Sequence, residues 1–282
     1  MEIDIVNFRG EKEPFSWQKV YLSAKRAGAA DNLARKIADE IQKIIYPGIE
    51  TAQIFAKVKE YLAKEDPRST IRFSLKKAIQ KLGPTGFPFE KYIGALWENQ
   101  GFKVKLNQFI AGRCLEYEID FLAEKDDLIY IGECKYRNSL FEQKIHSDTV
   151  LAIFARFLDI SEGNFFKTEK FKNFRLKPIL VTDAKFTESS IKFAQCRQIE
   201  LWGWRYPSDH GLEFLIEKQN LYPITILPSL DDSLAEVLIS KRIVLVRDLL
   251  KVNAEEFSKA ENIAPSRLET LINEGKILLN SK

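Results

Sequence analysis

Residues 114–136 read CLEYEIDFLAEKDDLIYIGECKY, and this stretch predicts two neighbouring β-strands. Apolar and acidic side chains alternate from residue 115 to residue 121, with the period of two that is typical of a strand. A second, largely apolar run follows from residue 128 to residue 135, and the polar residues 124–127 between the runs are typical of a hairpin turn. One face of the first strand is expected to carry Leu115, Tyr117, Ile119 and Phe121, and the other Glu116, Glu118 and Asp120.

If the two strands pair, Asp120 and Glu133 converge, with Lys135 beside them on the face of Glu133. Two carboxylates bind Mg²⁺ weakly enough to leave water and a phosphate oxygen among its ligands. A nearby lysine can orient the attacking water or stabilise the charge of the transition state. The set therefore suits phosphodiester hydrolysis. The alternative is a solvated acidic face beside an ordinary Glu-x-Lys pair.

The residues around this hairpin predict an α/β fold. A helix is expected over 87–100, and a strand over 102–109. After the hairpin, a helix over 148–158 precedes short buried strands at 179–182 and 200–204, with a helix over 188–196 between those two strands. Pro178 is expected at the start of the first of these strands, where a missing N–H is tolerated. Strand–helix–strand order indicates an α/β core.

Asp120 and the Glu133-Cys134-Lys135 tripeptide resemble the PD-(D/E)xK nuclease signature, in its Mrr-like restriction endonuclease branch. The stretch 83–90 (GPTGFPFE) resembles the first helix of that branch, and 117–120 (YEID) its His-Glu-Ile-Asp strand with Tyr117 in place of His. The motifs 155–157 and 201–204 are similar to its later core elements. The resemblance covers about residues 83–218. It implies a mixed sheet flanked by helices.

The same resemblance implies an activity and its residues. It implies an enzyme that cleaves double-stranded DNA with Mg²⁺ or Mn²⁺. Asp120 and Glu133 would be the metal ligands, Lys135 the catalytic lysine, and Glu90 an acidic residue that supports the metal site.

Residues 1–82 predict a short strand, a turn at 9–12 and then helices, one of which Ser16 can cap. Expected helices cover 17–28, 32–45, a segment opening at Thr51, and 70–82. This region resembles an ATP-cone, a nucleotide-sensing domain, through residues 5–10, 24–28 and 73–76. The resemblance implies binding of ATP or dATP through basic residues, here Arg9, Lys12, Lys19 and Arg26.

Two observations favour the alternative hypothesis that this region does not bind nucleotide. The family places Lys-Arg before its glycine turn, whereas Asn7 and Phe8 stand there in this chain, which removes charge-assisted bonds to phosphate. The segment 1–82 also holds 16 basic and 11 acidic side chains, a net charge of +5. That charge suits a docking domain or one that contacts DNA.

Residues 220–282 predict short helices and resemble a helix-hairpin-helix or SAM-like module. Its candidate hairpin, 262–266 (NIAPS), lacks the glycines through which such modules reach the DNA backbone. Protein–protein contact is an equally good interpretation.

A second candidate DNA contact lies at 165–175, where lysines and an arginine alternate with phenylalanines. Such a segment can bind phosphates and stack on bases. The alternative is a loop whose phenylalanines pack on the core.

Composition excludes several classes of protein. The 43 Lys and Arg nearly balance the 40 Asp and Glu, which excludes a polybasic nucleic-acid coat protein, and 45% hydrophobic content excludes a disordered chain. No apolar stretch is long enough to span a membrane, and the N-terminus lacks the pattern of a signal peptide. Three widely spaced cysteines predict a reducing, cytoplasmic location and no disulfide framework.

The sequence therefore predicts three consecutive domains: 1–82 ATP-cone-like, 83–219 catalytic and 220–282 helical. The expected function is a Mg²⁺-dependent, restriction-type DNA endonuclease, with regulation by nucleotide and a homodimeric state left open. One alternative is a non-catalytic, nucleotide-responsive DNA- or protein-binding protein on a nuclease scaffold. Another is a nuclease selective for branched DNA.

Overall fold

The computed structural model describes residues 3–83, 86–137, 143–171 and 173–279. Two predicted features fall partly outside them, Pro84-Thr85 of the expected domain boundary and Lys172 of the phenylalanine-rich segment. The described chain forms two compact units. Unit 1 comprises 1–78, 225–231 and 250–282, and unit 2 comprises 79–224 and 232–249. The units divide the segment 220–282 that the sequence predicts as one module; the three-domain division stays a prediction.

Unit 1 is mainly helical, as the sequence predicts, with one short hairpin. Ser16 caps the first helix by accepting the N–H of Lys19, and Pro67 opens a later helix behind the cap residue Asp66. The buried stripes of α1, α2 and α3 form one aliphatic core. The elements of this unit are β1 (Asp4–Val6), β2 (Lys12–Pro14), α1 (Trp17–Arg26), α2 (Asp31–Ile44), α3 (Thr51–Glu65), α4 (Pro67–Arg72), α12 (Ala254–Glu261) and α13 (Pro265–Leu279).

Two details of unit 1 differ from the prediction. β2 pairs with β1 and was not predicted. The helix expected over 70–82 is interrupted, so that α4 ends at Arg72 and α5 spans Leu75–Gln80. The N–H of Ser74 turns back to the carbonyl of Ile71, and the Phe73 ring stacks on Phe55 at 4.5 Å. This packing at Phe73 accounts for the interruption.

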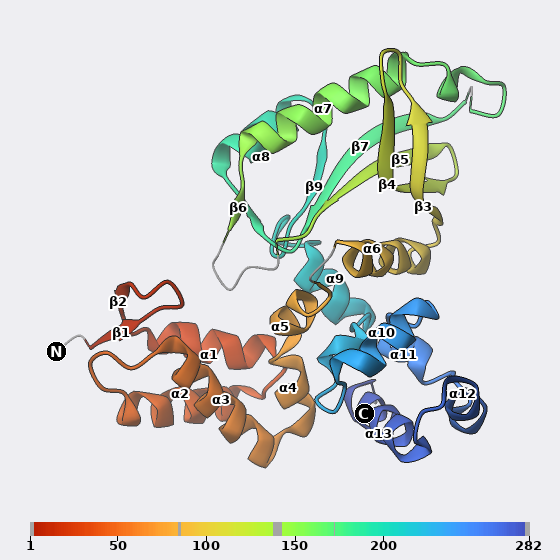
Figure 1. The fold of residues 1–282 in the computed structure, drawn as a ribbon. Helices are drawn as coiled ribbons and strands as arrows, with labels where there is room; N and C mark the ends of the chain where they lie inside the picture. Colours follow the sequence, from red (N-terminus) through yellow and green to blue (C-terminus); the bar gives the residue numbers. More distant parts are fainter. Residues whose placement is uncertain (1–2, 84–85, 138–142, 172, 280–282) are drawn as a thin grey trace. The chain divides into compact units, whose positions relative to one another are not determined.

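Unit 2 is an α/β structure whose sheet has the strand order β3-β4-β5-β7-β9. β4 is antiparallel to both of its neighbours, β3 and β5, whereas β5, β7 and β9 run parallel, so the sheet is mixed. Figure 1 shows α6 on one face of the sheet and α7 with α8 on the other. The elements are α6 (Phe87–Asn99), β3 (Lys103–Ala111), β4 (Glu116–Lys125), β5 (Leu128–Lys135), β6 (Lys144–Ile145), α7 (Ser147–Glu162), β7 (Arg175–Thr182), β8 (Lys185–Phe186), α8 (Glu188–Cys196), β9 (Glu200–Trp202), α9 (Leu212–Gln219), α10 (Asp232–Ser240) and α11 (Val246–Leu249).

The predicted elements of this unit are present, with one strand longer than expected. β7 begins at Arg175, so Pro178 lies inside the strand rather than at its start. β9 pairs with β7 only from Ile179 onward. A missing N–H is therefore tolerated at Pro178 because the second neighbouring strand begins one residue later.

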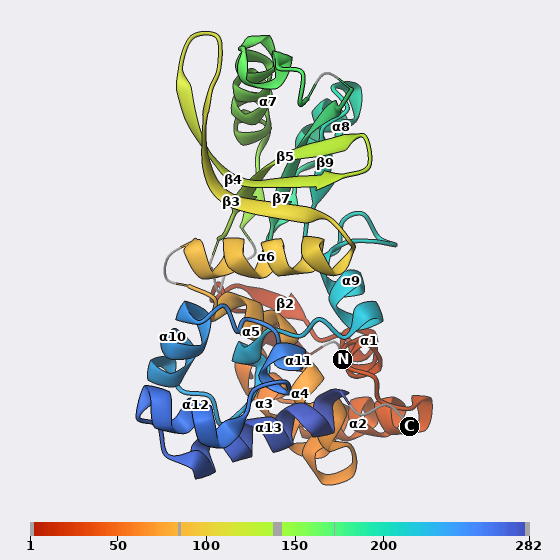
Figure 2. The same ribbon diagram turned by 90° about the vertical axis from the view of Figure 1, so that its right-hand side faces the viewer.

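The strict alternation expected for β4 is wrong at one point. Tyr117 and Ile119 pack with the α7 side of the sheet, whereas Phe121 contacts Trp97 of α6 on the opposite face. The ladder between β4 and β5 ends at the pair Phe121–Gly132. Beyond that pair the β3–β4 hairpin leaves β5 and runs alongside α7 (Figure 2), so the side chains before and after Asp120 face different layers.

The phenylalanine-rich segment packs mostly on the core. Phe166 is buried, and Phe171 and Phe174 pack against the same apolar cluster as β4 and β5. Phe165 remains 37% exposed. The packing interpretation of 165–175 is therefore the one that the fold supports.

Candidate functional site

The point where β4 leaves β5 brings three predicted residues together. Asp120 comes directly before Phe121, the first residue of β4 that pairs with β5, and its Oδ2 accepts the backbone N–H of Cys134 at 2.6 Å. This hydrogen bond from the β5 backbone to a side chain takes the place of the next backbone hydrogen bond between β4 and β5. Asp120 is thereby fixed beside the Glu133-Cys134-Lys135 end of β5, as the sequence predicts.

Glu133 is a buried carboxylate with two cationic partners. Its side chain is 8% exposed; Lys135 Nζ lies 2.5 Å from Oε1, and Arg156 Nη1 lies 2.5 Å from Oε2. A buried carboxylate without such partners would be very costly. The two cations therefore supply the counter-charges that a buried carboxylate needs.

Asp120 lies in an unfavourable environment for a negative charge. Burial, together with the neighbouring charge of Glu133, raises the pKa of Asp120 to about 7, while the Cys134 N–H opposes that rise. Glu90 adds to the increase and Lys135 reduces it. A cation bound at Asp120 would relieve this repulsion.

Glu90 reaches the site from α6, as predicted. Its Oε2 accepts the side-chain amide of Asn107 at 3.1 Å, and its charge acts on both Asp120 and Cys134. Asn107 has a positive φ of 50°, a conformation that Asn tolerates better than most residues. The structure therefore places Glu90 at the edge of the Asp120–Glu133 pair, held by a residue that the sequence analysis missed.

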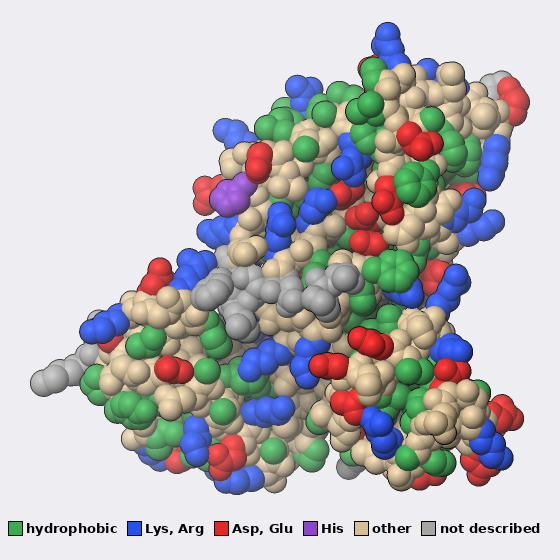
Figure 3. All heavy atoms as spheres, viewed as in Figure 1, with side chains coloured by type: hydrophobic (Ala, Val, Ile, Leu, Met, Phe, Trp, Pro, Cys, Tyr) green, Lys and Arg blue, Asp and Glu red, His purple; other side chains and the backbone are tan. Residues whose placement is uncertain are grey.

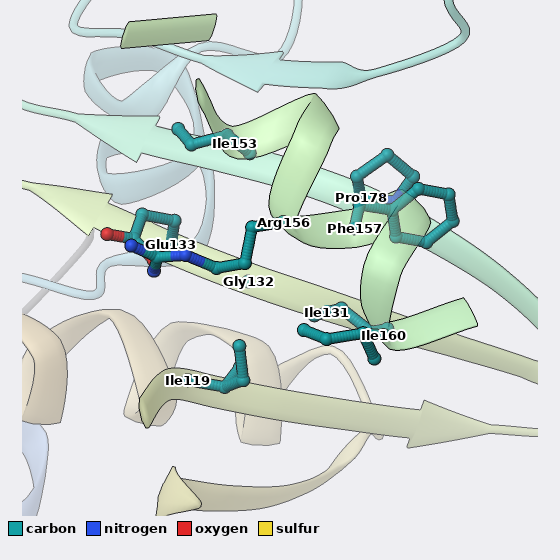
Figure 4. A pocket seen from close by; sticks show the side chains of 9 residues that line it. All are labelled: Ile119, Ile131, Gly132, Glu133, Ile153, Arg156, Phe157, Ile160 and Pro178. Atoms are coloured by element: carbon teal, nitrogen blue, oxygen red, sulfur yellow. The ribbon is translucent and has the colours of Figure 1, made fainter. Parts of the chain in front are cut away.

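Arg156 is the other residue that sequence reasoning did not assign to the site. Figure 4 shows it extending from α7 over Gly132 to Glu133. Its guanidinium also lies 5.7 Å from the ring centre of Tyr117 on β4. A signal was present in the sequence, because Arg156 is the single charged residue between Asp148 and Asp159, in an otherwise apolar helical run.

The residues at the site fit a weakly held divalent cation rather than a closed metal cage. Within the described ranges, no group of three or more His, Cys, Asp or Glu side chains is arranged to hold a metal ion. Mg²⁺ requires less, since it is usually held by one or two carboxylates and keeps several waters. Asp120 and Glu133 provide that pair.

The four cations predicted to bind nucleotide lie on unit 1 and are all exposed. Lys19 pairs with Glu13 at 3.4 Å, and Arg26 donates to the hydroxyl of Ser23 at 3.2 Å. Arg9 lies in the β1–β2 turn and Lys12 on β2. Lys19 and Arg26 are seven residues apart, so they share one face of α1, separated by about 10 Å along its axis.

The turn that contains Arg9 is closed by the side chain of Asn7. Asn7 Oδ1 accepts the backbone N–H of Arg9 at 2.8 Å and that of Glu11 at 3.1 Å. These N–H groups are therefore satisfied by the protein itself. Asn7 thus fixes the shape of this turn and brings no positive charge to it.

The charged side chains on the surface do not single out one face for a nucleic acid. On the face shown in Figure 3, basic and acidic side chains are intermingled rather than gathered into one area of a single sign. No helix in the described parts of the chain is long and apolar enough to cross a membrane.

Three comparisons place the chain among known proteins. Residues 222–279 match the family described as AF1548-like, C-terminal. An uncharacterised protein of Archaeoglobus fulgidus is 33% identical over 183 residues, which cover 65% of this chain and 98% of that protein. The crystal structure of AF1548, a protein of unknown function, aligns with 70% of this chain and 100% of its own, at 31% identity and a TM-score of 0.59. The chain therefore belongs to the AF1548-like family.

Proposed function

We propose that unit 2 is a Mg²⁺-dependent DNA endonuclease of the PD-(D/E)xK type, Mrr-like branch. The observation that carries the proposal is the placement of Asp120 against the Glu133–Lys135 end of β5, at the point where β4 and β5 separate. A partly buried, destabilised carboxylate beside a second carboxylate and a lysine is the arrangement that metal-assisted hydrolysis requires.

Asp120 and Glu133 would hold the Mg²⁺ or Mn²⁺ ion. When bound, such an ion polarises a phosphate oxygen and lowers the pKa of a bound water, which makes hydroxide available near neutral pH. Its positive charge would also favour the ionised form of Asp120, whose pKa is raised in the protein without metal.

Lys135 would act on the scissile phosphate. Its side chain is 33% exposed although it is paired with Glu133, so it can reach a substrate as well as the carboxylate. A cation in this place stabilises the extra negative charge of the pentavalent transition state or orients the attacking water. Glu90, held by Asn107, would keep the acidic side of the site in place.

The proposal extends to the other segments. Double-stranded DNA is the proposed substrate, and residues 1–82 with their net charge of +5 are a proposed ATP-cone-like region that contacts DNA or responds to adenine nucleotide. For the C-terminal segment, α12 and α13 are joined by residues 262–264, and the last two residues of the predicted hairpin 262–266 begin α13. That turn is the proposed equivalent of a helix-hairpin-helix turn.

A plasmid assay tests the activity. Supercoiled DNA is incubated with the full chain and Mg²⁺ or EDTA, and the wild type is compared with Asp120→Ala and Lys135→Ala. Each variant is expected to lose roughly 10²–10³-fold in cleavage rate, while the exposed controls Glu118→Ala on β4 and Lys177→Ala on β7 retain it. Cleavage that survives both site substitutions, or that persists in EDTA, would contradict the assignment. Methylated, unmethylated and branched DNA in the same assay would separate restriction from structure-selective cleavage.

The ion pairs of Glu133 favour one second candidate, a non-catalytic binding protein on a nuclease scaffold. Both carboxylate oxygens are occupied by cations, as they would be in a purely structural ion cluster. Calorimetric titration with ATP and dATP distinguishes the two functions. Nucleotide binding together with no cleavage of any DNA form would support the second.

A further inference from the structure

Arg156 connects three parts of the candidate site, and nothing in the Asp…Glu-x-Lys pattern requires it. It lies in the middle of α7, opposite the end of β5, and reaches Glu133 from 23 residues away in the sequence. Its Nη1 contacts only one of the two carboxylate oxygens, Oε2, and Lys135 contacts the other. The two oxygens are therefore held by different elements.

The conformation of Arg156 is restricted by its surroundings. The side chain borders a recess that is otherwise lined mainly by apolar residues of β4, β5 and α7, including Ile119, Ile131 and Phe157 (Figure 4). The recess has a volume of only about 10 Å³, room for at most one water. With the Tyr117 ring near the guanidinium, the arginine has little freedom to turn away from Glu133.

The helix that carries Arg156 is tied to the hairpin that carries Asp120. Near the C-terminal end of α7, the Asp159 carboxylate accepts the backbone N–H groups of Cys114 and Leu115, at 3.0–3.2 Å, from the tip of the β3–β4 hairpin. The N–H of Arg113 donates to the Asp159 carbonyl at 2.9 Å. These bonds fix the position of Arg156 relative to β4, the strand that carries Asp120.

We propose that Arg156 is a positioning residue that fixes the Glu133 carboxylate for the metal. It holds Oε2, so that Oε1 is the oxygen presented to the cation when Lys135 moves from Glu133 to the phosphate. This inference rests on the proposed nuclease function. It adds a second role for the arginine, because a carboxylate that keeps one cationic partner releases Lys135 more readily than one that depends on Lys135 alone.

An arginine suits this task better than a lysine. Its planar guanidinium binds a carboxylate in a defined orientation and remains charged at any working pH, whereas an ammonium is a compact and strongly hydrated charge. Residues that orient metal ligands in this way typically contribute 10- to 100-fold in metal affinity.

The test measures Mn²⁺ binding directly, through the electron paramagnetic resonance signal of free Mn²⁺, on the full-length chain. We expect Arg156→Met to weaken Mn²⁺ binding at least tenfold and Arg156→Lys to fall between that variant and the wild type. The control is Arg113→Met, which removes an arginine of the hairpin tip that is 71% exposed and pairs with Glu162. It should bind Mn²⁺ as the wild type does.

The outcomes separate the inference from the function on which it rests. Unchanged or tighter Mn²⁺ binding by a folded Arg156→Met protein would overturn the positioning role. Unchanged binding would mean that Arg156 does not affect the metal site, and tighter binding would mean that its positive charge only repels the ion. Should Arg156→Met not fold, Arg156→Lys decides alone: wild-type affinity in that variant overturns the requirement for a guanidinium. A wild type that binds no Mn²⁺ would overturn the metal-dependent function and the inference together.

Discussion

Glu60 and Glu133 are both glutamates held by two cations, and they lie in different units. In unit 1, Lys57 and Lys64 contact the two oxygens of Glu60 at 3.0 and 3.1 Å, with the Glu60 side chain 50% exposed. In unit 2, Glu133 is 8% exposed between its two cations. The partners are similar, but only one glutamate has been removed from water. The difference indicates that Glu60 belongs to an ordinary helix surface and that Glu133 is maintained at a free-energy cost that function must justify.

The largest expected effect on stability is that of Glu133→Gln. The substitution keeps the shape of the side chain but leaves Lys135 and Arg156 without their shared counter-charge, which should destabilise unit 2 by about 3 kcal/mol. The four tryptophans are Trp17 in unit 1 and Trp97, Trp202 and Trp204 in unit 2, so fluorescence during urea unfolding reports mostly on the sheet. Glu60→Gln is the control and should leave the midpoint unchanged. Equal shifts in both variants would remove the distinction between the two glutamates.

A smaller loss of stability is expected when a side chain is added to the packed sheet beside Glu133. A Cβ added at Gly132 would lie 2.1 Å from Cζ of Phe121, inside the aromatic layer between β4, β5 and α6. Gly132→Ala should therefore destabilise unit 2 by about 2 kcal/mol. Phe121→Leu in the same chain should restore part of that loss by making room. Additive losses in a double-mutant cycle would show that the two side chains do not compete for space.

Asp120→Asn is expected to stabilise the protein, and only at higher pH. Because the pKa of Asp120 in the folded protein, about 7, lies above its ordinary value of 3.8, the folded state favours the protonated acid. That favourable contribution is complete below about pH 4 and is lost as the pH rises through 7. The neutral Asn variant should thus match the wild type at pH 4 and exceed it by about 1.5 kcal/mol at pH 8, after allowance for partial solvent screening.

Urea unfolding in EDTA at both pH values measures this difference. Saturating Mg²⁺ should reduce or reverse the gain at pH 8, because the ion binds the wild-type carboxylate and stabilises the folded state. A gain of the same size at pH 4 and pH 8 would show that the charge of Asp120 is not its cause.

Local patterns predicted much of the sheet and of the acidic site. Alternation and turn residues within 114–136 identified the β4–β5 hairpin and placed Asp120, Glu133 and Lys135 together. The change of face at Phe121 was missed because it follows from the end of the ladder with β5, which no period reveals. Arg156 was missed because its contact depends on how α7 lies over β5, although an isolated charge in an apolar helix was a usable signal.

The smallest expected effect is the response of the two glutamates to salt. Exposed pairs such as those of Glu60 are screened when NaCl is raised from about 0.1 to 1 M, where the Debye length falls from about 10 to 3 Å, whereas buried pairs are screened much less. Hydrogen–deuterium exchange resolved by peptide follows α3 and β5 separately in one sample. We expect salt to change the protection of α3 around Glu60 slightly and that of β5 around Glu133 not at all. The reverse order would mean that water and ions reach Glu133 freely, and its two cations would then no longer require a functional explanation.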